Sequence, residues 1–339
     1  MPDTTLNGKG LTNAELVKFL GLPSDIIDKL KTAQGSDYTA ASNEFLEALH
    51  NKVLYQTVTS MEFTNPFKKY DGFPVNFGDT IENIFVELPD GKKFDPEATD
   101  PFNKAKPSVK ALYATINYEL QYETTIEDSL LRRACLSEYG FMNLIDTLIA
   151  ALAKSMSIDE YYATLTMLDN PAIYADGIEE LSVSSDATVR AATVAKKIVN
   201  TVSSFKLPKS INNAKKVMNV CKPSDILLVI KAELLNDINL DYLTGVFNLS
   251  KVDLVKNIIE VDGFQTVMDT NGTKTVTGTD IDFVVIDAKG FDNHVALQDG
   301  GLIYNPKGKY TNHFYNLWKI VSFKQFHNAR AFKLKTVTQ

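Results

Sequence analysis

The last stretch of the chain, residues 302–333, constrains the fold most. It contains the only tryptophan, two of the four histidines and a large share of the aromatic residues. Aromatic and β-branched residues at a period of two favour a strand that packs on both faces. Asn305-Pro306-Lys307-Gly308 is a turn signal, with proline second and glycine fourth. A strand so late in the chain must insert into a sheet built from earlier segments. We expect its core to consist of Tyr315, Trp318, Phe323 and Phe326.

The composition is that of a globular protein and argues against some functions. Of the 339 residues, 44% are hydrophobic and 23% charged, which is ordinary. The net charge of −7 and the pI near 5.3 argue against a dedicated nucleic-acid binder, which needs a basic face. Cys135 and Cys221 lie outside any CxxC pair, so we expect buried, inert thiols in a reducing cytosol. We expect no secretory signal, since the N-terminus has no basic segment followed by an apolar one, and no membrane partner, since no apolar run reaches membrane-spanning length.

The first two segments are predicted to be an arm and a projecting loop. Residues 1–64 carry short helical patterns, beginning with a capping box at Thr12–Glu15, and are expected to form a helical arm. In residues 65–126, a strand at Thr80–Glu87 and a long strand at Val109–Tyr122 flank a polar, proline-punctuated tip. Such a two-stranded finger is marginal alone in water and needs a neighbour. Its candidate inter-subunit contacts are Lys92, Lys93, Phe94, Phe102, Lys104 and Lys106.

Three further segments follow the finger. In residues 127–213, apolar positions at helical spacing predict one long helix over Ser137–Leu168 and a second over Ala187–Ser203. Residues 214–301 alternate strands and helices, so we expect a compact α+β unit. Its predicted elements are buried strands at Ile226–Ile230 and Ile281–Ile286, a helix at Leu240–Phe247, a strand at Ile258–Phe264 and a hairpin turn at Asp269–Gly272. Residues 302–339 are the terminal strand.

The sequence supplies no catalytic set. It has no phosphate loop, HExxH, GxSxG or dinucleotide fingerprint. His50, His294, His313 and His327 are scattered, which favours structural roles. Asp280 and Asp282 could share one face of a strand and bind a divalent cation, but no further oxygen ligand is indicated, so a solvated strand end is favoured. We therefore expect no catalytic residue, no metal and no cofactor.

Several short sequence motifs resemble those of one known family, and they occur in the same order along the chain. They are Asn65-Pro66-Phe67-Lys68-Lys69, Gly78-Asp79-Thr80-Ile81-Glu82-Asn83-Ile84, Val261-Asp262-Gly263-Phe264, and Asn305-Pro306-Lys307-Gly308-Lys309-Tyr310 with Tyr315, Trp318, Phe326, Asn328, Ala329, Ala331 and Phe332. The order of segments resembles that of the major capsid protein of tailed bacteriophages, which has the Hong Kong 97 type fold. The motifs resemble those of the phi-twenty-nine-like podophage group within that family. That fold has an N-terminal arm, an extended two-stranded loop, a long spine helix, and peripheral and axial domains.

The resemblance implies a structural subunit. The expected partners are further copies in hexamers and pentamers, a separate scaffolding protein, a portal or connector, and packaged double-stranded DNA without sequence-specific contact. The expected location is the virion, after assembly in the host cytoplasm. Family members carry an immunoglobulin-like domain after the capsid fold and this sequence stops at Gln339, so no decoration role is expected. The alternatives are an encapsulin-type nanocompartment shell and a metal-dependent cytosolic hydrolase using Asp280 and Asp282.

Overall fold

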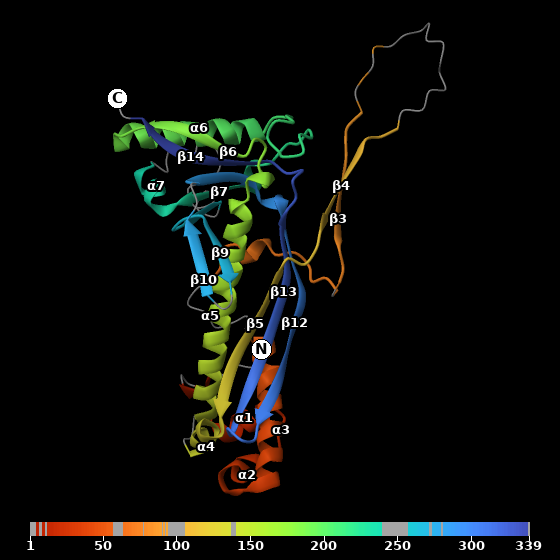
Figure 1. The fold of residues 1–339 in the computed structure, drawn as a ribbon, viewed down its shortest axis with the longest axis vertical. Helices are drawn as coiled ribbons and strands as arrows, with labels where there is room; N and C mark the ends of the chain where they lie inside the picture. Colours follow the sequence, from red (N-terminus) through yellow and green to blue (C-terminus); the bar gives the residue numbers. More distant parts are fainter. Residues whose placement is uncertain are drawn as a thin grey trace.

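A single long helix, α5 (Gly140–Asp169), runs along most of the molecule (Figure 1). In this computed structural model the described residues are 5–6, 9–10, 12–56, 64–76, 78–89, 91, 93, 106–136, 140–238, 257–270, 273–278 and 281–337. The other helices are α1 (Asn13–Phe19), α2 (Ile26–Thr32), α3 (Gly35–Gln56), α4 (Asp128–Leu136), α6 (Ala187–Phe205) and α7 (Ala232–Asp237). The sequence predictions of α5 and α6 are confirmed.

The described strands form five sheets. They are β1 (Thr5–Leu6), β2 (Lys9–Gly10), β3 (Ile81–Val86), β4 (Val109–Ala114), β5 (Tyr118–Glu127), β6 (Ile178–Ser184), β7 (Ile226–Lys231), β8 (Ile258–Val261), β9 (Gln265–Thr270), β10 (Thr273–Gly278), β11 (Phe283–Asp287), β12 (Phe291–Asn305), β13 (Tyr310–Phe323) and β14 (Ala329–Val337). Three sheets are the pairs β1-β2, β3-β4 and β9-β10. The other two have the orders β12-β13-β5 and β6-β14-β11-β7-β8.

The three-stranded sheet lies alongside α5 (Figure 1). Its central strand, β13, pairs antiparallel with both β12 and β5, so the predicted late insertion is confirmed. The predicted turn joins β12 to β13, because Asn305 Oδ1 accepts hydrogen bonds from the backbone N–H groups of Lys307 and Gly308, both at 3.0 Å. Two segments were predicted to meet between residues 301 and 302, but β12 runs through both residues without a break.

The five-stranded sheet is buried on both faces at one end of the molecule. Successive residues of β7 alternate between two cores: Leu228 faces the apolar side of α6, and Leu227 and Val229 face the end of α5. The sheet takes β6 and β14 from outside residues 214–301, so the α+β unit expected there is assembled from separated segments. The predicted strand at Ile226–Ile230 and the hairpin at Asp269–Gly272 are confirmed by β7 and by β9-β10. The helix expected at Leu240–Phe247 lies outside the described residues.

The terminal stretch differs from the single strand that was predicted. It forms two strands, β13 and β14, which belong to different sheets. β14 lies between β6 and β11, parallel to the first and antiparallel to the second. The chain leaves one sheet at Phe323 and enters the other at Ala329, and between them the side chains of Phe326 and Asn328 are buried.

The N-terminal helices, which lie in the predicted helical arm, pack against the body of the molecule. The predicted capping box at Thr12 and Glu15 opens α1. Leu16, Leu30 and Phe45, from α1, α2 and α3, share one core with residues of α4, α5 and β13. Each helix is too short or too polar to be stable alone, so its apolar stripe is buried against these neighbours.

The finger is shorter than predicted. The long returning strand is two strands, since β4 ends at Ala114 and pairs with β3, whereas β5 begins at Tyr118 and pairs with β13. Asn117 causes the break. Its side chain accepts from the backbone N–H of Val321 at 2.8 Å and donates to the Val321 carbonyl at 2.9 Å, which fixes the chain to the edge of β13 where β5 begins. Beyond that point β3 and β4 project from the body (Figure 1).

Candidate assembly surfaces

The two faces of the finger differ in their surroundings. On one face, the tilted rings of Phe85 and Phe326 pack with their centroids 5.4 Å apart, and Lys110 Nζ donates to the backbone carbonyl of Lys215 at 3.2 Å. The other face is apolar, and its side chains are exposed among the residues that the structure describes. Its exposed residues are Ile84 (59% exposed), Val86 (56%), Val109 (54%) and Tyr113 (68%). Cross-strand pairing of Val86 with Val109 and of Glu82 with Tyr113 places them on one surface.

A buried ionic cluster holds the segment that leads into the finger. Lys319 of β13 is 3% exposed, and its Nζ lies 2.9 Å from Asp71 Oδ2 and 3.0 Å from Glu160 Oε1. Lys68 completes the cluster, with its Nζ 3.2 Å from carboxylate oxygens of both Asp71 and Glu160. Burial would lower the pKa of Lys68, but the two carboxylates outweigh burial and raise it. The cluster joins the finger's approach, α5 and β13 in one charge-neutral unit.

A second buried group ties the finger itself to β12. The Asp292 carboxylate accepts from Asn83 Nδ2 of β3 at 2.6 Å, and it lies 3.2 Å from Lys324 Nζ and 3.1 Å from His294 Nε2. Burial would raise the pKa of Asp292, but these partners outweigh burial and lower it. His294 Nδ1 is 2.7 Å from the backbone carbonyl of Phe73, so β12 also holds the chain before the finger. A Cβ at Gly72 would overlap the His294 ring.

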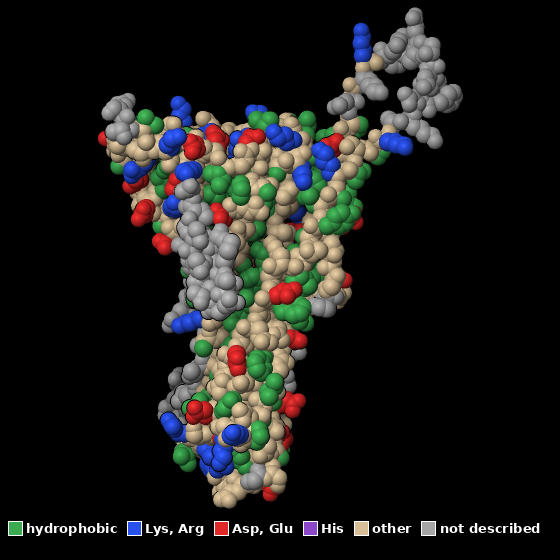
Figure 2. Space-filling view, in the orientation of Figure 1, with side chains coloured by type: hydrophobic (Ala, Val, Ile, Leu, Met, Phe, Trp, Pro, Cys, Tyr) green, Lys and Arg blue, Asp and Glu red, His purple; other side chains and the backbone are tan. Residues whose placement is uncertain are grey.

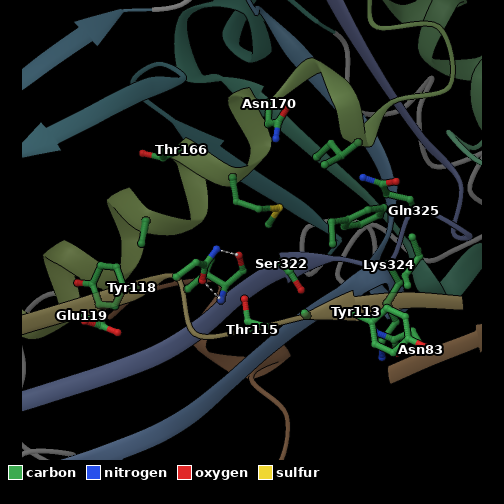
Figure 3. Close-up of a pocket in the computed structure, with 18 of the residues that line it drawn as sticks. Asn83, Tyr113, Thr115, Tyr118, Glu119, Thr166, Asn170, Ser322, Lys324 and Gln325 are labelled. Carbon is green, nitrogen blue, oxygen red and sulfur yellow. Dashed lines mark hydrogen bonds between the residues drawn. The ribbon is translucent and has the colours of Figure 1, made fainter. Parts of the chain in front are cut away.

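A pocket of about 680 Å³ opens where the finger diverges from β13. Figure 3 shows Thr115 and Ser322 near its centre, Thr166 of α5 and Asn170 just after that helix on one side, and Asn83 with Tyr113 at the finger end. The described lining residues include no cysteine or histidine, so they supply no nucleophile–base pair of the cysteine–histidine kind. The pocket is the wedge left between strands that separate at Asn117.

The sequence-predicted contact residues are only partly described. Lys93 and Lys106 are exposed at the two sides of the finger tip. Lys92, Phe94, Phe102 and Lys104 lie outside the described residues. Of the four terminal-strand residues, Tyr315, Phe323 and Phe326 are buried. Trp318 is only half-buried, since it points to the outer face of the three-stranded sheet, opposite Glu119 and Leu297.

The residues considered for catalysis have structural partners. Asp282 accepts from Lys231 Nζ at 2.7 Å and from the backbone N–H of Leu334 at 2.6 Å; Asp280 lies outside the described residues. Among the described residues there is no group of three His, Cys, Asp or Glu side chains that could hold a metal ion. Both cysteines are buried, and burial raises the pKa of Cys135 to about 11. His327 Nδ1 lies 2.7 Å from Asp287 Oδ2 inside the fold.

Sequence reasoning missed both ionic groups. One signal for Lys319 was available: the period of two in β13 places Lys319 on the same inward face as Tyr315 and Leu317. A lysine there must be paired with carboxylates. Asp292 had no comparable signal, because its partner Asn83 comes from a strand more than 200 residues earlier in the chain.

The sequence of this chain is similar to those of several phage proteins. The family model described as Phi29-like phage major capsid protein matches residues 26–333. The major capsid protein of Bacillus phage B103 is 29% identical over 297 residues, which are 86% of this chain and 63% of that protein. The major capsid protein of Streptococcus phage Cp-1 is 27% identical over 312 residues, 88% of this chain and 84% of that protein. The chain thus spans less than two thirds of the length of the Bacillus phage relative.

Solved structures show the same fold. The capsid structure of Staphylococcus phage Andhra aligns with a TM-score of 0.61 at 11% identity, covering 82% of this chain and 86% of that one. The mature capsid of bacteriophage PhiM1 aligns with a TM-score of 0.55 at 12% identity, covering 83% and 90%. The architecture is therefore the α+β fold of the Hong Kong 97 type. None of the described helices is long and apolar enough to cross a membrane.

These matches do not favour the two alternatives, a nanocompartment shell and a metal-dependent hydrolase. The family is a structural one and not an enzyme family. The match of the family model over residues 26–333 covers most of the chain, including the finger, α5 and both large sheets. This chain belongs to the Phi29-like phage major capsid protein family.

Proposed function

We propose that this chain is a shell subunit, copies of which assemble into the closed head that encloses packaged double-stranded DNA. The observation that carries the proposal is the uncovered apolar face of the finger. A two-stranded hairpin is marginal in water, and four large apolar side chains on one face add the cost of exposed apolar surface. An adjacent copy of the chain would cover that face.

The parts of the fold then take roles in the shell. The finger, within residues 65–126, would be the extended loop that lies across a neighbour, and α5 the spine, within residues 127–213. Residues 214–301 would form the axial domain, whose five-stranded sheet also includes β6 and β14. The three-stranded sheet, with β13 of residues 302–339 as its central strand, would belong to the peripheral domain. Residues 1–64 would be the N-terminal arm. Lys92, Lys93, Phe94, Phe102, Lys104 and Lys106 remain the proposed contacts of the finger tip.

Contacts of this kind are heterologous, and they close into hexamers and pentamers when the rotation between copies closes. Obligate contacts of a shell should bury roughly 2,000 Å² or more for each pair of subunits. We further propose a separate scaffolding protein and a portal as partners, with assembly in the host cytoplasm. The acidic net charge of −7 suits DNA contact that is weak and independent of sequence.

Negative-stain electron microscopy of the purified chain, with a crowding agent to encourage assembly, tests the proposal. Closed shells or curved sheets of capsomer-like rings are the expected result. If the chain stays dispersed both alone and after co-expression with a scaffolding protein, the proposal of a self-assembling shell subunit is wrong.

A further inference from the structure

Positive charge is concentrated in one part of this acidic chain. Residues 187–222 contain eight lysines and arginines and no aspartate or glutamate, although the whole chain has a net charge of −7. They are Arg190, Lys196, Lys197, Lys206, Lys209, Lys215, Lys216 and Lys222. The segment comprises α6 and the loop 206–222 that follows it. Figure 2 shows lysine and arginine side chains along the end of the molecule where these elements lie.

The loop 206–222 has no regular strand or helix, yet its backbone is held in place by side chains. The fully buried Asn213 accepts from the backbone N–H of Val217 at 2.9 Å and donates to its carbonyl at 2.6 Å. Asn219 Nδ2 donates to the backbone carbonyl of Phe326 at 3.0 Å. Because buried amides fix the loop, its outward side chains are presented in a preformed arrangement.

Four large apolar side chains of this loop point into solvent. Leu207 is 50% exposed, Ile211 53%, Met218 52% and Val220 52%. A bridge between Lys209 and Asn219 brings the two halves of the loop together, so these side chains lie on adjoining segments. A group of exposed apolar side chains on a fixed loop marks an interaction site more often than scattered single ones do.

The lysines around these apolar side chains are open to a partner. Lys209, Lys215 and Lys222 are exposed, and no carboxylate among the described residues lies within ion-pair distance of them. Lys216 Nζ lies 3.4 Å from Asp176, with both side chains largely exposed. We call this surface the lysine patch; it comprises Leu207, Lys209, Ile211, Lys215, Met218, Val220 and Lys222.

We propose that the lysine patch binds an acidic, amphipathic segment of another protein, reversibly and in competition with salt. Carboxylates would pair with Lys209, Lys215 and Lys222, while apolar side chains cover the four apolar residues of the patch. A permanent contact between copies fits less well, because lysine is depleted at the cores of stable interfaces. The finger face has the more apolar chemistry of a permanent contact, since Glu82 is the one charged residue on that face of β3 and β4. Duplex DNA fits less well too, because its phosphate backbone offers nothing to bury four apolar side chains.

The role of such a partner during assembly rests on the proposed shell function. Binding of the acidic segment to the lysine patch does not, so peptide binding and shell formation are tested separately. The probe is a labelled amphipathic peptide of leucine and glutamate, titrated with dispersed full-length chain and followed by fluorescence anisotropy. The same peptide with lysine in place of glutamate, and a DNA duplex, are the comparison probes. The expected result is binding of the glutamate peptide alone, weakening as salt rises.

Two variants and one control locate the binding. The triple change Lys209→Glu, Lys215→Glu and Lys222→Glu should lower the affinity of the chain for the glutamate peptide by more than about tenfold. The double change Leu207→Ser with Met218→Ser should also lower this affinity, although it leaves the net charge of the chain unchanged. The control, Lys18→Glu, Lys31→Glu and Lys307→Glu, changes the net charge equally at exposed sites near the other end of the molecule and should leave binding within about threefold.

Three results would overturn the inference. Equal loss in the control means that net charge alone attracts the peptide. Unchanged binding after Leu207→Ser with Met218→Ser, together with tighter binding of the duplex, means that the patch is a polyanion surface. No binding of the glutamate peptide to the unaltered chain rejects the patch, even where the same chain still forms shells.

Discussion

Lys319 Nζ lies 2.9 Å from Asp71 Oδ2, and this contact joins residues that are 248 positions apart in the sequence. The same ammonium group is 3.0 Å from Glu160 of α5. One buried lysine on the central strand of the three-stranded sheet therefore positions the approach to the finger against the long helix. The direction in which the finger leaves the body depends on this cluster and on Asp292.

Lys319→Met should destabilise the fold and loosen the finger together. The change leaves Asp71 and Glu160 without their buried partner, at an expected cost of about 3 kcal/mol in the free energy of unfolding. Denaturant titration measures the cost, and limited proteolysis between residues 64 and 120 measures the loosening. Lys335→Met, at an exposed ion pair with Glu180, is the matched control and should cost less than about 1 kcal/mol. Equal costs for the two variants would contradict a structural role for the cluster.

Acid should destabilise the attachment of the finger through Asp292. The pKa of Asp292 is lower in the folded chain than in the unfolded one, so its stabilisation is present above its unfolded pKa, about 4, and is lost as the pH falls through the folded value. Asp292→Asn should cost about 2 kcal/mol at neutral pH, since Lys324 is partly exposed. Denaturation of both proteins at a series of pH values is the measurement. The difference in unfolding free energy should shrink below pH 4; a difference that is constant with pH would count against this assignment.

Polar substitution on the outer face of the finger should separate folding from assembly. Ile84→Ser with Val109→Ser changes side chains that are already more than half exposed, so the unfolding free energy of the dispersed chain should change by less than about 1 kcal/mol. Shell formation, counted by electron microscopy, should fall sharply. Leu130→Ser, at an exposed apolar residue of α4, controls for lost apolar surface in general. Normal shells from the finger variant would refute the proposed contact.

Removal of the finger tip should have a similar outcome. A chain without residues 90–106 should remain folded and soluble, because β3, β4 and the buried groups at the root lie outside the deletion. It should no longer form closed shells. Circular dichroism and sedimentation check folding, and electron microscopy checks closure. Assembly as in the full chain would show that residues 90–106 make no necessary contact between subunits.

Trp318→Ala should cost less than the loss of a buried aromatic ring. The indole is half-buried on the outer face of the sheet, so an unfolding cost of about 1–2 kcal/mol is expected. Phe332→Ala, in the core of the five-stranded sheet, should cost about 3–5 kcal/mol. Thermal or denaturant unfolding of both variants measures the difference. A larger cost at Trp318 would mean that its outer face is covered in the dispersed protein.

Elements with a strong internal period were predictable from the sequence. The long helix, the buried run at Ile226–Ile230 and the turn at Asn305 each depend on residues close together in the chain, and each is present. The division of residues 109–127 into two strands was not predictable, because Asn117 ends one strand by bonding to Val321, which is distant in sequence. Alternate side chains of a strand point to opposite faces, so Trp318 could be placed on the outer face of β13 only after Tyr315 and Leu317 were known to point inward.

The surfaces for assembly were predictable to a smaller degree. The need of the two-stranded finger for packing against another surface could be inferred, because turn-rich segments separate it from the rest of the chain. Which of its faces is free depends on the contacts of Phe85 and Lys110 with segments more than 100 residues away. The positive charge of residues 187–222 was present in the sequence, but overall acidity concealed it.

The position of β14 between β6 and β11 has a consequence for synthesis on the ribosome. Before residues 329–337 have left the exit tunnel, β11 and β6 cannot be joined, and the five-stranded sheet has a gap in its middle. A nascent chain therefore lacks a complete subunit surface until residues 329–337 have emerged from the ribosome. Neighbouring chains on one messenger RNA would be kept from polymerising before that point, and each subunit would become competent only after β14 has inserted between β6 and β11.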